Sequence, residues 1–78
     1  MTTLLNNIEK AFLATAKFAS VEVHTIKAFP NFCDIVVLDE VKANHLASKL
    51  RANGIKEVNV TDLSEIDELG FNVEVRYN

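Results

Sequence analysis

Apolar residues recur every three or four positions along the first part of the chain. The stripe consists of Leu4, Ile8, Ala11, Phe12, Ala16 and Ala19. This spacing predicts an amphipathic helix over residues 4–19. Leu13 falls on the opposite face with Asn6, Lys10 and Lys17. We therefore expect Leu13 to point into solvent, where a partner protein can reach it.

Two stretches rich in β-branched residues follow, at residues 20–29 and 33–39, on either side of Pro30-Asn31. They predict two strands joined in a hairpin, because β-branched side chains favour strands and proline favours turns. A turn centred on Pro30-Asn31 places Lys27 opposite Asp34, Ile26 opposite Ile35 and Val23 opposite Leu38.

This predicted hairpin is apolar on both faces. Val21, Val23, Val36 and Leu38 alternate onto one face, and Ile26, Ala28, Cys33, Ile35 and Val37 alternate onto the other. A two-layer domain covers only one of them, so the second face predicts contact with a second copy or with another protein. A bulge that shifts the register within residues 20–29 is the competing explanation.

A second helix is predicted over residues 40–53. Asp39 is suited to cap it, Ala43, Leu46, Ala47 and Leu50 form its apolar stripe, and Gly54 is suited to end it. Residues 55–63 alternate as a half-buried strand, a short helical turn precedes Gly70, and residues 71–77 alternate again. These elements predict one α+β domain over residues 1–78, a two-layer sandwich with a mainly antiparallel four-stranded sheet and two helices on one face.

Composition fits one small folded domain whose surfaces carry its function. The chain has 78 residues, of which 49% are hydrophobic, and only 2 glycines and 1 proline. A core this thin leaves little room for a cofactor, and we expect none. Cys33 is the only cysteine, so no intramolecular disulfide forms and a reducing, cytoplasmic setting fits. The longest aliphatic run, residues 35–38, is too short for a membrane segment.

No catalytic motif accompanies this composition. A Cys33 nucleophile would need a nearby histidine base, but the predicted register places Ala28, rather than His24, opposite Cys33. His24 and His45 lack the spacing of metal ligands, and two glycines cannot form a phosphate-binding loop. We therefore expect a protein that is not an enzyme and holds no metal.

Charge is distributed unevenly along the chain, although its sum is only -3. Bases gather in and after the second predicted helix, at Lys42, His45, Lys49, Arg51 and Lys56. They suggest a nucleic-acid-binding or ribonucleoprotein accessory as the alternative function. The negative net charge and the lack of interleaved aromatic residues make nucleic acid the less favoured partner.

The favoured interpretation is a small protein-binding module, an inhibitor or adaptor that occludes a surface of a larger protein. Its predicted contacts are Leu13, the hairpin tip Phe29, Pro30, Asn31 and Phe32, and the acidic residues Glu65, Asp67 and Glu68. Small acidic inhibitors with which viruses of bacteria block host defence or nucleic-acid-processing enzymes have this size. We expect a monomer or a homodimer, the latter formed through the hairpin or through residues 71–77 as an edge strand.

Overall fold

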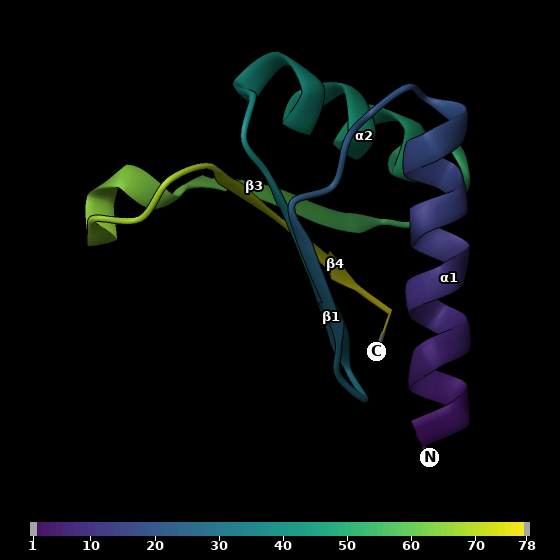
Figure 1. Ribbon diagram of the computed structural model, residues 1–78. Coiled ribbons are helices and arrows are strands. Elements are labelled where there is room, and N and C mark those ends of the chain that lie inside the picture. The colour runs from purple at the N-terminus through teal and green to yellow at the C-terminus, as the bar shows by residue number, and fades with distance from the viewer. Residues whose placement is uncertain (1, 78) are drawn as a thin grey trace.

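The computed structural model describes residues 2–77 and confirms the predicted α+β class and order of elements. The elements are α1 (Thr2–Phe18), β1 (Thr25–Ala28), β2 (Phe32–Val37), α2 (Glu40–Ala52), β3 (Glu57–Asp62), the 3-10 turn η1 (Leu63–Ile66) and β4 (Phe71–Arg76). All strand pairs are antiparallel, and the order across the sheet is β1-β2-β4-β3. Helix α2 packs on β2, β4 and β3, while α1 contacts β1 and α2 (Figure 1).

The predicted hairpin register is confirmed over the strand that forms. Lys27 lies opposite Asp34 and Ile26 lies opposite Ile35. The same pairing places Ala28 opposite Cys33.

The first predicted strand is shorter than expected, because residues 20–24 leave the strand conformation. Ser20 has a left-handed backbone with a φ of 60°, and Val21, only 5% exposed, turns into the core behind α1. Regular pairing therefore begins at Thr25, and the predicted pair of Val23 with Leu38 does not form.

The prediction that Val21, Val23, Val36 and Leu38 line one face of the hairpin is therefore wrong. Val21 is buried and Val23 is half-buried against the core. Val36 is the member of that set that stays on the strand face away from the helices. The change of chain direction at residues 20–24 removes Val21 and Val23 from this face, while Val36 is half-buried and Leu38 is 55% exposed.

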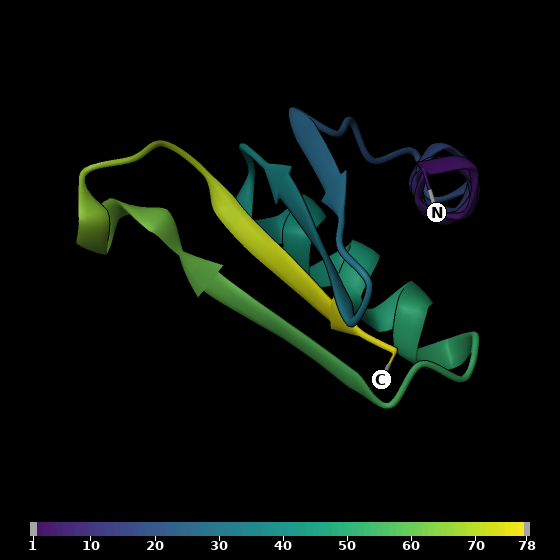
Figure 2. The ribbon, with the colours of Figure 1, turned by 90° about the horizontal axis from the view of Figure 1, so that it is seen from below.

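The prediction that residues 71–77 form an edge strand, which could pair with a second copy, is also wrong. β4 lies between β2 and β3 and pairs with both, so residues 71–77 form no sheet edge. The edges belong to β1 and β3 (Figure 2).

All three helical segments end in the same hydrogen-bonded closure, in which one residue adopts a left-handed backbone. That residue is Ser20 after α1, Gly54 after α2 and Asp67 after η1, with φ of 60°, 98° and 59°. After α1, the N–H of Ser20 donates to the carbonyl of Lys17 and the N–H of Val21 donates to that of Ala16. After α2, Gly54 donates to Arg51 and Ile55 donates to Leu50 in the same way. After η1, Asp67 donates to Ser64 and Glu68 donates to Leu63. Only the closure at Gly54 carries the glycine that makes it recognisable in the sequence.

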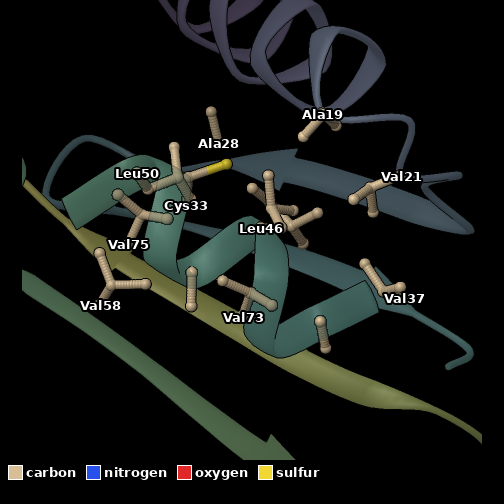
Figure 3. Close-up of a cluster of buried hydrophobic side chains, with 14 residues drawn as sticks. Ala19, Val21, Ala28, Cys33, Val37, Leu46, Leu50, Val58, Val73 and Val75 are labelled. Atoms are coloured by element: carbon tan, nitrogen blue, oxygen red, sulfur yellow. The ribbon is translucent and has the colours of Figure 1, made fainter. Parts of the chain in front are cut away.

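The core lies between α2 and the sheet. All four residues of the predicted α2 stripe are buried, and Cys33, Ile35, Val73 and Val75 face them from the central strands (Figure 3). Among the described residues the buried set contains no polar or charged side chain. The polar and charged side chains of the described residues therefore lie outside this core.

Candidate functional site

The hairpin tip is built more tightly than two free aromatic anchors would be. Pro30 and Asn31 are exposed, but Phe29 and Phe32 are half-buried and stack on one another with ring centroids 4.6 Å apart. The Lys27 ammonium lies 5.4 Å from the Phe29 centroid, and the Arg76 guanidinium lies 5.7 Å from the Phe32 centroid. Each ring thus has a stacking partner and a cationic neighbour within the chain.

Tyr77 fixes this tip from the side of the core. Its hydroxyl is shared between the carbonyl oxygens of Phe29 and Phe32, at 2.7 Å from the latter, and its N–H donates to Asn31 at 3.3 Å. Burial raises the pKa of the Tyr77 hydroxyl, so it stays a donor at neutral pH. The alternation of the last strand predicts an inward Tyr77, but it does not show that the hydroxyl binds a turn 45 residues or more away in sequence.

The acidic residues Glu65, Asp67 and Glu68 are exposed on and just after η1. This turn is held by hydrogen bonds, because Asp62 accepts from the N–H of Ser64 at 2.9 Å. The N–H of Ser64 and its hydroxyl together lower the pKa of the Asp62 carboxyl, which keeps the cap ionised. Figures 1 and 2 show η1 projecting beyond the sheet at the end farthest from α1.

Two large apolar side chains are exposed here, one at the end of η1 and one three residues after it. Ile66 is 64% exposed and Leu69 is 86% exposed. Both residues stand in an acid-rich stretch that has neither helical nor strand periodicity. An apolar residue in such a stretch is a sequence signal for an exposed apolar side chain, and reasoning from charge alone missed it.

Tertiary structure adds further apolar residues at this end. Val37 pairs with Phe71, so the end of β2 lies beside the start of β4. Leu38, 55% exposed, then packs so close to Gly70 that a Cβ there would lie 3.2 Å from it. We call this surface the η1 end. Its apolar residues are Leu38, Ile66 and Leu69, and its acids are Asp62, Glu65, Asp67 and Glu68.

The predicted basic residues divide into two groups. Lys42, His45 and Lys49 are exposed on the outer surface of α2. Arg51 instead turns to the sheet, where its Nη2 donates to the carbonyl of Val58 at 2.6 Å. Lys56 lies at the end of the sheet opposite η1, where it lines a shallow depression of about 370 Å³ with Arg76 and Tyr77.

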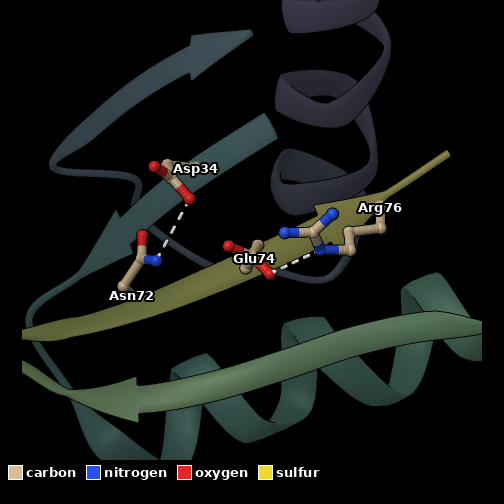
Figure 4. Close-up of polar contacts among 4 residues, drawn as sticks. All are labelled: Asp34, Asn72, Glu74 and Arg76. Carbon is tan, nitrogen blue, oxygen red and sulfur yellow. Dashed lines mark hydrogen bonds and ion pairs between the residues drawn. The ribbon is translucent and has the colours of Figure 1, made fainter. Parts of the chain in front are cut away.

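The sheet face opposite the helices carries charges of both signs. Asn72 donates to Asp34 at 3.2 Å, and Arg76 forms an ion pair with Glu74 at 3.1 Å (Figure 4). The Glu74 carboxylate thus offsets the charge of Arg76 on this face.

The remaining candidates show no catalytic arrangement. Cys33 is fully buried, and burial with the nearby Glu9 and Asp34 charges raises the pKa of its thiol to about 12. His24 is exposed and lines a separate depression of about 340 Å³ with Leu38 and Lys42. No group of three or more His, Cys, Asp or Glu side chains among residues 2–77 is arranged to hold a metal ion. Leu13 is 40% exposed on α1, apart from the η1 end.

Comparison of the chain with known protein families, with curated proteins and with solved structures finds no match. Within the described residues neither helix has the length and apolar character needed to cross a membrane.

Proposed function

We propose that this protein is a non-enzymatic binding module that occludes a surface of a larger cytoplasmic protein, with the η1 end as its contact. The observation that carries the proposal is the exposure of Ile66 and Leu69, at 64% and 86%, in the segment from Leu63 to Gly70, whose ends are joined by the hydrogen bond from the Leu63 N–H to the Gly70 carbonyl. Exposed large apolar side chains on a rigid support are suited to fill a partner's pocket, and a held turn loses little conformational freedom on binding.

The acids around these two residues indicate the chemistry of the partner. Glu65, Asp67 and Glu68 are exposed, and none of them has a salt bridge within the described residues. Carboxylates around an apolar contact favour a groove rimmed by lysine or arginine, and such grooves are used by enzymes that hold nucleic-acid phosphates. An inhibitor of a nucleic-acid-processing or defence enzyme, of the kind that viruses of bacteria use, fits this chemistry.

Affinity capture from the native cell lysate with quantitative mass spectrometry tests the proposal. The bait variants are Ile66→Ser/Leu69→Ser and, as a matched control, Phe18→Ser, which removes an 88% exposed apolar side chain from the end of α1. We expect one stoichiometric protein to be retained by the wild type and by the control, and to be lost by the double variant. A partner that the double variant retains would show that the η1 end is not the contact.

The acidic residues are tested on the captured partner by association kinetics. Glu65→Lys/Glu68→Lys reverses two charges but leaves the left-handed Asp67 in place. We expect slower association and a weaker salt dependence, because rim charges act mainly on the encounter rate. Unchanged kinetics would remove the charge-complementary groove from the proposal.

The alternative function, nucleic-acid binding by α2, has a direct test of its own. Titration of labelled RNA and DNA with the wild type and with Lys42→Ala/Lys49→Ala compares binding at physiological salt. Salt-sensitive binding that the double variant loses would favour the accessory role. We expect no such binding, since Arg51 donates to the carbonyl of Val58 and leaves Lys42, His45 and Lys49 as the basic group on the outer surface of α2.

A further inference from the structure

The two edges of the sheet are protected unequally. At the β1 edge, α1 lies alongside, and the Glu9 carboxylate accepts from the N–H of Ala28 at 2.9 Å. At the β3 edge, Arg51 binds the carbonyl of Val58. Figure 2 shows β3 along the side of the sheet remote from α1. Unprotected edge strands pair readily with another chain.

The Arg51 contact also identifies the backbone groups that face outward from β3. Because Val58 directs its carbonyl away from β4, alternation along an antiparallel strand directs the N–H and C=O groups of Val60 and Asp62 outward as well. Asn59 and Thr61 direct theirs toward β4. The outward edge thus presents a regular row of donors and acceptors.

We propose that β3 pairs in antiparallel orientation with β3 of a second copy, which joins two sheets into one of eight strands. The register that fits places Asn59 on the twofold axis. Each copy's Val58 then faces Val60 of the other copy, Lys56 faces Asp62, and Ile55 faces Leu63. Apolar, oppositely charged and amide pairs all match in this single register, and such cross-strand pairs stabilise sheets.

Charge along the molecule favours the same orientation. Lys56 directly precedes β3 and lies near Arg76, whereas Asp62 ends β3 at the acidic η1 end. Antiparallel pairing brings the basic end of each copy beside the acidic end of the other, while parallel pairing would place like charges together. A twofold axis repeats every contact, so the complementary pairs count twice.

Arg51 is compatible with this pairing. A carbonyl oxygen has two lone pairs, so Val58 can accept from Arg51 and from the second copy's Val60 N–H together. Ile66 and Leu69 take no part in the strand pairing, and Asp62 is the residue of the η1 end that does, so the Ile66 and Leu69 variants test the proposed function separately from the dimer.

Sedimentation velocity of the full chain at about 1 μM to 1 mM tests the dimer, with two reciprocal variants. Lys56→Asp places acids opposite one another, and Asp62→Lys places bases opposite one another. We expect each variant alone to dimerise about tenfold more weakly than the wild type. An equimolar mixture should recover wild-type dimerisation, because each variant then faces its complement.

The control is Lys49→Asp, which reverses an exposed charge on α2 away from the edge and should leave dimerisation unchanged. A wild type that stays monomeric over the whole range overturns the proposal, as does a mixture that associates no better than the separate variants.

Because Asp62 also caps η1, a second variant tests the register without it. Asn59→Cys places two thiols on the axis in a non-hydrogen-bonded pair, where Cα atoms are about 4.5 Å apart, which suits a disulfide. We expect rapid covalent dimerisation on mild oxidation. Thr61→Cys, whose copies lie about four residues apart in this register, should link slowly, and equal rates for the two variants would contradict the register.

Discussion

The carboxylate of Glu9 accepts a hydrogen bond from the backbone N–H of Ala28 at 2.9 Å, so that α1 protects the free edge of β1. The two residues come from elements that the sequence pattern predicts separately, and no motif connects them.

Removal of this carboxylate should destabilise the fold. We expect Glu9→Ala to lower the free energy of unfolding by about 1–2 kcal/mol, since a half-buried donor loses a charged acceptor. Chemical denaturation measures the loss, and hydrogen exchange should show faster exchange at the Ala28 amide. Lys10→Ala, at the exposed neighbouring position, is the control. Equal stability of the two variants would contradict the role of Glu9.

Tyr77→Phe removes only the hydroxyl that binds the hairpin tip. We expect a loss of about 1 kcal/mol in the free energy of unfolding, because the ring keeps its stacking on Phe12 at 6.3 Å while the hydrogen bonds to Phe29 and Phe32 disappear. Nuclear magnetic resonance should show the largest shifts around Asn31. Shifts spread evenly over the core would indicate a general packing defect instead.

Cys33 should resist alkylation by iodoacetamide near neutral pH and react only when the chain unfolds, because only the thiolate is nucleophilic. The raised pKa, about 12, also sets the direction of a pH dependence. A thiol has a pKa of about 8.5 in an unfolded chain, so its contribution to stability is complete below that pH and is lost as the pH rises toward 12. Cys33→Ala should lack this alkaline loss in denaturation measured across pH, and rapid labelling of the folded wild type would contradict the burial.

Substitution of Gly54 and of Gly70 by alanine distinguishes the effect of backbone strain from that of steric clash. Both have positive φ, but a Cβ at Gly70 would lie 3.1 Å from the Val37 carbonyl oxygen, whereas a Cβ at Gly54 would meet nothing within 4 Å. We expect Gly54→Ala to cost about 1 kcal/mol of stability and Gly70→Ala about 1–3 kcal/mol more. Thermal unfolding measures both, and equal losses would exclude a steric contribution at Gly70.

The left-handed backbone of Ser20 in the closure of α1 raises the free energy of the folded state, since this conformation is unfavourable for residues other than glycine. Ser20→Gly should therefore stabilise the protein by about 0.5–1 kcal/mol. Ser48→Gly, the same change inside α2, should destabilise it by a similar amount. If both substitutions destabilise to the same extent, the closure at Ser20 does not limit stability.

The candidate site was only partly accessible to sequence reasoning. Glu65, Asp67 and Glu68 stand out by charge, and the structure places them on an exposed turn. Leu38 joins this surface because it lies against Gly70, which is 32 positions away and is brought there by the pairing of β2 with β4. Phe29 and Phe32 stay predicted contacts, but the sequence did not show that their neighbours on the sheet, Lys27 and Arg76, lie against the two rings.

Local chemistry determined the elements themselves. The α2 helix begins after Asp39 and closes at Gly54 because capping depends on a few consecutive residues, and the same holds for alternation in the strands. The order of the strands, the interior place of β4 and the turn of Val21 into the core depend on which distant segments bury one another. That choice is made by the free energy of the whole packed core, to which no single stretch of sequence contributes enough to be decisive.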